Sequence, residues 1–386
     1  MRIVDIRTRT VPISRYADSS ISSDGLDTTI VAVVTSETRG GSPVVGFGFS
    51  SIGRYAQTGL IGERFAPRLL AAKERDLCGE SGDGFDPLLA WECMMRGEKP
   101  GGHGERSVAV GTLDMALWDV AAKLAGMPLA RLLATRFGGG LLPETVAVYA
   151  AGGYPYPDDD LARLAEEVKG LLGRGYTRVK IKIGAHTIAQ DAARIECVLA
   201  LLPNAACLAV DAMNRYQREE ALAAADAFSR YGLGWFEDFC DPLDYATHAE
   251  VARRYPHPLA AGEALFSAAD ARNLALYGGL RPNQDVLLFD PAHCYGLAGY
   301  LRIVEQMESA GWRRTSFWPH GGHLFALQVA AGLGLGGSES NPEIFQPFGG
   351  FADDASVIDG RTSLPSVAGI GFESRARLAE LFRSLL

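Results

Sequence analysis

Residues 178–184 read RVKIKIG, and their alternation is typical of a β-strand. The three β-branched residues fall on one face of such a strand, which places Lys180 and Lys182 together on the other face. One explanation is an edge strand with a solvated face, where lysine is a common guard residue. The other is a strand whose lysines point into a functional cavity. The surrounding sequence decides between the two.

Short apolar runs alternate with helical patterns from about residue 145 onward. The runs read VAVYAAGG, RVKIKIG, CLAVDAMN, GWFEDF, PLAAGEALF, DVLLFD and TSFWPH, and segments with helical periodicity such as DLARLAEEVKGLLGRG lie between them. Repeated βα units of this kind form a parallel sheet. Seven or eight units predict an α/β fold of the (β/α)8 barrel type.

The N-terminal part follows a different pattern. The stretches RIVDIRTRTVPI, TTIVAVVTSE and PVVGFGFS alternate in strand fashion and predict an antiparallel sheet. The following stretch, ERSVAVGTLDMALWDVAAKLAGMPLARLL, has a helical period, and Gly126 followed by Pro128 predicts a break between two helices. We therefore expect an α+β domain over residues 1–140 and the barrel over residues 141–345.

Composition excludes several classes of protein. A chain of 386 residues with 47% hydrophobic residues can bury a large core, and its net charge of -9 argues against a nucleic-acid or anionic-membrane partner. The six cysteines form no C-x-x-C pair, which favours reduced thiols over disulfides or a zinc site. We find no apolar run of the kind that signal peptides or membrane helices need. We therefore expect a soluble, cytoplasmic protein with no membrane partner.

Polar residues occur at the predicted carboxyl ends of successive strands, at intervals of 26 to 30 residues. They are Lys182, Asp211, Glu237, Glu263, Asp290 and His320. Each interval is about one βα unit, and the carboxyl ends of all barrel strands face the same mouth. These side chains should therefore converge on one cavity, and the lysines of RVKIKIG should point into it.

Asp211, Glu237 and Glu263 are candidate metal ligands. A single acidic residue at a strand end is commonly a helix N-cap or a solvated charge. Three on successive strands would repel one another without a cation between them, and hard oxygen ligands favour Mg²⁺, with Mn²⁺ as an alternative.

A metal beside lysines and an Asp/His pair suits the removal of a proton from the carbon next to a carboxylate. The enediolate that results needs strong electrostatic stabilisation, which a metal supplies. Lys182 can act as the base only if its pKa falls from the usual value of about 10.4 toward neutrality, and both Lys180 and a metal act in that direction.

These residues, together with Glu339 in GGSES and the helix GTLDMALWDVAAKLAGMPL, resemble the mandelate racemase subgroup of the enolase superfamily. Within it, EKPGGHGERSVAVGT, FDPAHCYGLAGY, PHGGH, AAGLGLGGSES and FQPFGGFADD resemble D-tartrate dehydratases. The resemblance spans nearly the whole chain. It implies an N-terminal capping domain that closes over the barrel mouth, a C-terminal segment (346–386) that returns to this domain, and a homo-oligomer.

The resemblance also implies roles for the site residues. Lys182 would abstract the α-proton with help from Lys180, the three acidic residues would bind Mg²⁺, and Glu339 would hydrogen-bond the enediolate. Asp290 would orient His320, which would protonate the departing β-hydroxyl, so that a hydroxy acid loses water and becomes a 2-keto acid. D-tartrate, which would give oxaloacetate, is the best-supported substrate.

Some positions depart from the D-tartrate dehydratase pattern. Ser50 and Ile52 stand in the capping loop, and Ala264 follows the third ligand, where asparagines are typical. Met213 takes the place of an asparagine after the first ligand, and Asn214, one residue later, becomes the candidate substrate contact. These changes remove hydrogen-bonding capacity, so an aldonate or aldarate is the alternative substrate.

Two further residues have competing interpretations. Lys99 is either a contact for a distal substrate carboxylate or a solvated lysine. His323 in PHGGH is a weaker candidate for substrate contact or for the acid role, and the resemblance favours His320 as the acid.

Three functions are alternatives to a dehydratase: a dinucleotide-dependent enzyme, a racemase or epimerase, and a non-catalytic metal-binding barrel. GLGLGG (332–337) matches a dinucleotide-binding pattern, but it comes late in the chain and no ribose-binding acid follows about 20 residues on. A racemase or epimerase could use the same acid/base pair. A non-catalytic metal-binding barrel is the remote alternative. The presence of both the base and the acid argues against it.

Overall fold

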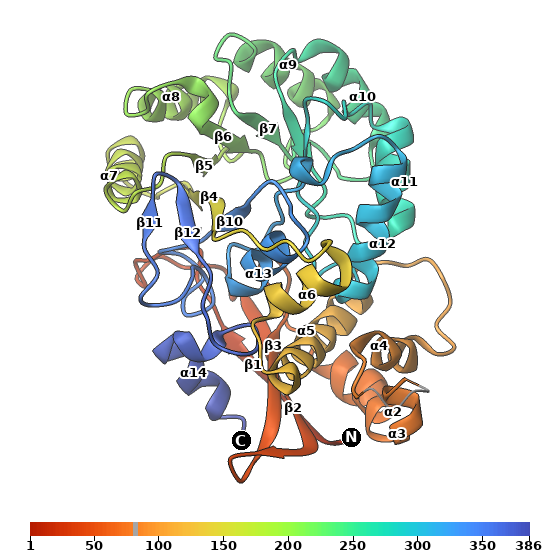
Figure 1. The fold of residues 1–386 in the computed structure, drawn as a ribbon. Helices are drawn as coiled ribbons and strands as arrows, with labels where there is room; N and C mark the ends of the chain where they lie inside the picture. The colour runs from red at the N-terminus through yellow and green to blue at the C-terminus, as the bar shows by residue number, and fades with distance from the viewer. Residues whose placement is uncertain (80–83) are drawn as a thin grey trace.

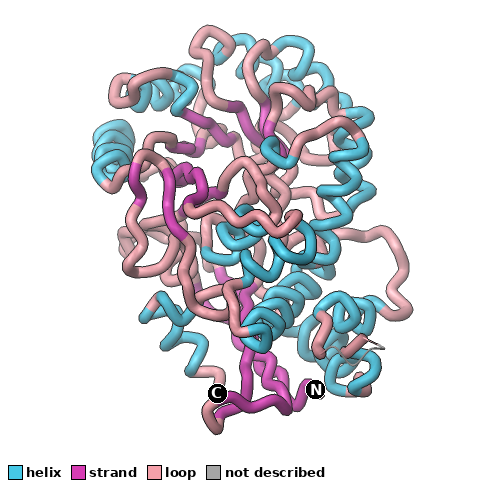
Figure 2. The backbone as a smooth tube through the Cα atoms, in the orientation of Figure 1, coloured by secondary structure: helices cyan, strands magenta, loops and turns pink. Residues whose placement is uncertain are grey.

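The structure is a computed structural model that describes residues 1–79 and 84–386. Figure 1 shows a barrel in one half of the molecule and, in the other half, a small sheet flanked by helices; Figure 2 shows the same division by secondary structure. In the N-terminal sheet, β1 (Ile3–Pro12) and β3 (Ser42–Phe49) pair antiparallel to the central β2 (Asp27–Arg39). This agrees with the antiparallel sheet that the sequence predicts.

The long helix α5 (Glu105–Ala125) packs directly on β3. A Cβ atom on Gly46 would lie 2.0 Å from the carbonyl oxygen of Ala116, so glycine permits this close approach. The helix ends at Gly126, whose φ of 68° is left-handed, which confirms the predicted break. The other helical segments described outside residues 80–83 in this part are α1 (Thr58–Leu60), the π-helical turn Ile61–Phe65, α2 (Ala66–Leu70), α3 (Glu74–Leu77), α4 (Pro87–Met95) and α6 (Leu129–Phe137).

Six consecutive strands form the parallel part of the barrel, each hydrogen-bonded to the next. They are β4 (Thr145–Gly152), β5 (Val179–Lys182), β6 (Leu208–Asp211), β7 (Trp235–Glu237), β8 (Leu259–Ala261) and β9 (Val286–Leu287). The predicted strand TSFWPH is reduced to a single parallel bridge between Phe317 and Leu287. The short strand β10 (Ser338–Ser340) then pairs with β4 and closes the ring.

Helices follow the strands as expected for an α/β barrel. Within the fully described span 145–340 they are α7 (Asp160–Gly173), α8 (Ile188–Leu199), α9 (Arg218–Phe228), α10 (Tyr245–Arg254), α11 (Ala268–Tyr277), α12 (Gly296–Ser309) and α13 (Leu324–Gly332). The eighth strand, β10, is followed by a loop and then by the hairpin β11 (Val357–Ile358) and β12 (Arg361–Ser363), which pairs antiparallel with β4. The fold class predicted from the sequence is therefore confirmed.

The position of β5 settles the question raised by RVKIKIG. It lies between β4 and β6, so it is not an edge strand, and Lys180 and Lys182 are only 1% and 6% exposed. Val179 and Ile181 join the apolar core between strands and helices. The lysines therefore point into the barrel, as the second explanation requires.

The C-terminal segment returns to the N-terminal sheet. The Phe382 ring of α14 (Ala376–Arg383) stacks on Phe47 of β3 with ring centroids 5.0 Å apart. Arg7 of β1 donates a hydrogen bond to the carbonyl oxygen of Leu385. We refer to the N-terminal sheet, its helices and α14 as the cap. The domain boundaries at residues 140 and 345 stay predictions.

No helix in the described part of the chain has the length and apolar character needed to cross a bilayer.

Candidate active site

A cavity of about 470 Å³ opens at the carboxyl ends of the barrel strands, between the barrel and the cap. The barrel contributes predicted site residues to its wall: Lys182, Asn214, Glu263, His320 and Glu339. The cap contributes residues from the loops before β2 and after β3, among them Arg15, Tyr16, Asp24, Ile52 and Arg54. A substrate in this cavity would therefore contact both parts of the molecule.

Two buried lysines of β5 pair with carboxylates at the cavity. Lys180 Nζ lies 2.6 Å from Glu237 Oε1 and 3.0 Å from Glu339 Oε1, and Lys182 forms an ion pair with Asp211. Burial alone would raise the pKa of Asp211, but the two lysines lower it to about 2. Burial would lower the pKa of Lys182, but the charge of Asp211 raises it above its usual value. Lys182 is therefore protonated in this arrangement.

Carboxylate oxygens of Asp211, Glu237 and Asp238 lie within 4.8 Å of one another, and all three residues are buried. Burial raises the pKa of Glu237 well above its usual value despite the opposing charge of Lys180. Burial, with Glu263 and Asp211 adding to it, also raises the pKa of Asp238. The ionised forms of these groups are thus disfavoured unless further positive charge is present.

This group fits a hard divalent cation, because its donors are carboxylate oxygens held close together. The structure brings together two of the three predicted ligands, Asp211 and Glu237. Asp238 joins them although the sequence analysis did not select it, and its only signal is the Glu-Asp doublet in GWFEDF. Glu263 lies outside that group but lines the cavity, and its buried Oε2 atom has no hydrogen-bond partner among the described residues. Its role as a ligand stays a prediction.

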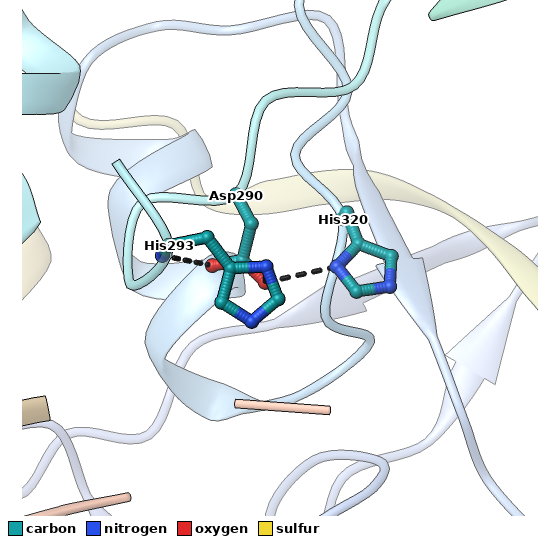
Figure 3. A group of neighbouring side chains, drawn as sticks. All are labelled: Asp290, His293 and His320. Atoms are coloured by element: carbon teal, nitrogen blue, oxygen red, sulfur yellow. Dashed lines mark hydrogen bonds and ion pairs between the residues drawn. The ribbon is translucent and has the colours of Figure 1, made fainter. Parts of the chain in front are cut away.

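Asp290 and His320 form a hydrogen-bonded pair, drawn in Figure 3. His320 Nδ1 donates to Asp290 Oδ2 over 2.9 Å, which leaves Nε2 as the other ring nitrogen, 3.6 Å from Glu263 Oε2. Burial would lower the pKa of His320, but Glu263 and Asp290 raise it to about 9. The ring is therefore protonated near neutral pH and can donate a proton from Nε2.

A residue of the cap completes the surroundings of Asp290. Ser51 Oγ lies 2.6 Å from Asp290 Oδ2 and 2.9 Å from His323 Nε2. His323 Nδ1 accepts from the backbone N–H of Ala326, so its proton is on Nε2 and is donated to Ser51, whose own hydroxyl donates to Asp290. Sequence reasoning missed Ser51, which carries no motif of its own.

Of the three weaker candidates for substrate contact, only Asn214 lines the cavity. Asn214 lines the cavity, but its amide nitrogen donates to Asp238 Oδ2 over 3.2 Å. His323 is fully buried at the N-terminus of α13 and is not part of the cavity wall, and its Nε2 atom bonds to Ser51. Lys99 is exposed and also lies outside the wall, on a loop whose carbonyl groups are held by Arg106.

Of the four positions that depart from the D-tartrate dehydratase pattern, three line the cavity and one does not. Ile52, Met213 and Ala264 line the cavity. Ser50 does not, because its buried hydroxyl accepts a hydrogen bond from Thr112 of α5. The structure therefore removes Ser50 from the residues that could contact a substrate directly.

Comparison with known proteins finds a matching family and several similar sugar-acid dehydratases. Residues 163–378 match the family described as Enolase C-terminal domain-like. The L-talarate/galactarate dehydratase of Salmonella typhimurium is 27% identical over 347 residues, covering 89% of this chain and 81% of that protein. The arabinonate dehydratase of Saccharolobus solfataricus is 26% identical over 295 residues, covering 72% and 74%.

A solved structure shares the whole architecture. The crystal structure of L-talarate dehydratase from Polaromonas sp. JS666, complexed with Mg and L-glucarate, has a TM-score of 0.71 and 25% identity, covering 96% of this chain and 94% of that chain. The family match extends over more than half of the sequence and includes the strands that carry the lysine, acidic and histidine residues of the site. The chain belongs to the enolase superfamily, with a barrel domain of the mandelate racemase and muconate lactonizing enzyme type.

Proposed function

We propose that this protein is a Mg²⁺-dependent dehydratase of sugar acids. The observation that carries the proposal is a single cavity whose wall contains Lys182 and His320, with Asp290 paired to His320 behind the wall and a cluster of buried carboxylates beside it. A lysine base and a histidine acid in one cavity can remove a proton and a hydroxyl from neighbouring carbons. The dehydratases among the relatives support this reaction type.

Asp211, Glu237 and a third carboxylate, from Asp238 or Glu263, would hold the Mg²⁺. When bound, the ion would offset their negative charge, relieve Lys182 of the attraction of Asp211, and stabilise negative charge on a substrate carboxylate.

The protein side chains carry out the proton transfers. Lys182 Nζ takes the proton from C2, and the electron pair of the broken C–H bond forms the C2–C3 double bond. The C3–O bond breaks as His320 Nε2 gives its proton to the leaving hydroxyl, which departs as water. The remaining enol takes up a proton at C3, loses the proton of its C2 hydroxyl, and becomes a 2-keto acid.

Positive charge at the cavity wall favours a substrate with two carboxylates. Arg15, Arg54 and Arg215 line the cavity, and among the described residues none of the three forms an ion pair with a carboxylate. Asp24 is the acidic residue that the cap contributes to the wall. A carboxylate at the far end of the substrate would pair with guanidinium groups in a bidentate manner. We therefore assign the contact with the distal substrate carboxylate to these arginines, instead of to Lys99.

The relatives favour a longer substrate than tartrate. Those named above are dehydratases of talarate, galactarate and arabinonate, all of which have longer carbon chains. We therefore place an aldarate first and D-tartrate, the main prediction from the sequence, second.

A screen of mono- and diacid sugars, including D-tartrate, tests the proposal by measuring 2-keto acid formation with Mg²⁺. We expect an aldarate to be dehydrated, and the matched Lys182→Ala variant to be inactive. If only aldonates react, the role of the arginines is wrong. If the protein only inverts the configuration at C2, the dehydratase assignment is wrong and a racemase or epimerase replaces it.

A further inference from the structure

His293 is a buried polar residue of the cavity that the reaction described above does not use. It lies on the loop between β9 and α12, lines the cavity, and is 2% exposed. Neither of its ring nitrogens has a hydrogen-bond partner among the described residues. Leaving a buried polar group unpaired costs about 1–3 kcal/mol, so this residue needs an explanation.

The surroundings of His293 hold the ring in place without satisfying it. Its backbone N–H donates to Asp290 Oδ1, as Figure 3 shows, and its ring meets Phe266 edge-on with centroids 6.0 Å apart. The loop itself is pressed against α5, where a Cβ atom on Gly111 would lie 1.6 Å from the carbonyl oxygen of Ala292. The backbone of this loop therefore has little freedom to carry the ring toward another partner.

Asp290 is the nearest charged group, but it does not bind the His293 ring. His293 Nδ1 lies 3.7 Å from Asp290 Oδ2, which is too long for a hydrogen bond, and Oδ2 already accepts from Ser51 and His320. Burial lowers the pKa of His293 more than Asp290 raises it, so the ring is neutral, with one N–H donor and one acceptor nitrogen.

The position of the ring indicates what its partner would be. His293 and His320 both line the cavity, with ring centroids 5.7 Å apart, so neighbouring groups of one bound molecule could contact both rings. A hydroxyl group can either donate to or accept from a neutral imidazole, whereas a carboxylate can only accept. A hydroxyl close to the one that His320 protonates therefore suits this ring best.

We propose that His293 is a specificity-determining residue that binds the substrate hydroxyl on C4, next to the hydroxyl that leaves from C3. This inference rests on the proposed dehydratase function and deepens it. D-tartrate has a carboxylate at C4 and offers no such hydroxyl, so the substrate would be an acid with hydroxyl groups on both C3 and C4.

The test compares an aldarate that the wild-type protein dehydrates, galactarate being the first to try, with its 4-deoxy analogue. The wild-type protein should prefer the hydroxylated substrate in kcat/KM by about 10-fold to 100-fold, the factor that one lost hydrogen bond to a buried group carries. In His293→Phe, which keeps a flat ring without nitrogens, the two substrates should react equally. His293→Asn, which offers an amide in place of the ring, should recover part of the preference.

A second measurement separates recognition from damage to the fold. The thermal midpoint of His293→Phe without substrate should equal or exceed that of the wild-type protein, because an unpaired buried imidazole is replaced by an apolar ring. A preference for the hydroxylated substrate that persists in His293→Phe would overturn the inference while leaving the dehydratase function intact. Absence of both dehydration and α-proton exchange for every sugar acid tried would overturn the proposed function, and this inference with it.

Discussion

The hydroxyl group of Ser51 joins the cap to the catalytic pair of the barrel, so its removal should affect both stability and activity. The residue follows β3 and has a left-handed backbone conformation with a φ of 59°. Its hydroxyl donates to Asp290 and accepts from His323, and all three residues are buried. Ser51→Ala would remove both hydrogen bonds without changing the size of the side chain much.

The expected loss of stability follows from these contacts. A hydrogen bond to a charged group contributes about 1.5–3 kcal/mol, and a buried donor left unpaired, here His323 Nε2–H, costs about 1–3 kcal/mol. Because the two effects involve the same small group, we expect a total of about 3 kcal/mol. We also expect kcat to fall by about 10-fold or more, since Asp290 would hold His320 less firmly and small displacements of a catalytic group are costly.

Urea unfolding followed by tryptophan fluorescence, together with kcat on the substrate found in the screen, measures both effects. Ser50→Ala is the matched control, because Ser50 is the preceding residue and is equally buried, and among the described residues its hydroxyl bonds only to the neutral hydroxyl of Thr112. The control should lose about 1 kcal/mol and keep its kcat. If Ser51→Ala loses no more stability than Ser50→Ala, the Ser51 hydroxyl does not link the cap to Asp290.

Three further predictions concern the metal, the acid/base pair and pH. Treatment with EDTA should abolish activity, and Mg²⁺ should restore it and raise the thermal midpoint; full turnover by the metal-free protein would contradict the site assignment. Lys182→Ala should lose dehydration and α-proton exchange with D₂O, whereas His320→Asn should lose only dehydration; normal dehydration by Lys182→Ala would show that the base is another residue. Burial lowers the pKa of His248 to about 4, below the unfolded value of about 6.5, so the unfolded chain takes up a proton first as the pH falls. The contribution of His248 to the free energy of unfolding should therefore be fully present above pH 6.5 and fall by up to about 3 kcal/mol toward pH 4. In His248→Gln, compared with the wild-type protein by urea midpoints at pH 7 and 5, this part of the pH dependence should be lost.

The sequence predicts those parts of the site that repeat with the βα unit. Lys182, Asp211 and Glu237 end consecutive strands in register, as the regular spacing predicts. Asp290 and His320 form the expected pair even though the strand predicted around TSFWPH is a single bridge. The superfamily resemblance is confirmed by the family match. The homo-oligomer and the cytoplasmic location stay predictions.

The sequence does not predict the parts of the site that depend on loops. Ser51 and Asp238 have left-handed φ values of 59° and 46°, and neither residue type nor spacing marks such positions. His293 is selected by its burial and its unpaired nitrogens, which only the packed structure reveals. Lys99 is exposed and lies outside the cavity wall, which favours the solvated lysine of the two interpretations that its sequence leaves open.

The return of α14 to the N-terminal sheet has a consequence for synthesis on the ribosome. Phe47 precedes the barrel in the sequence, and its stacking partner Phe382 follows the barrel, close to where Arg7 binds Leu385. Domains generally fold as they emerge, N-terminal part first. Here the sheet that precedes the barrel packs against a helix that is made after the barrel, so the barrel can form while the cap is still incomplete. A nascent or truncated chain would then display a finished barrel whose mouth stands open to solvent and to proteases.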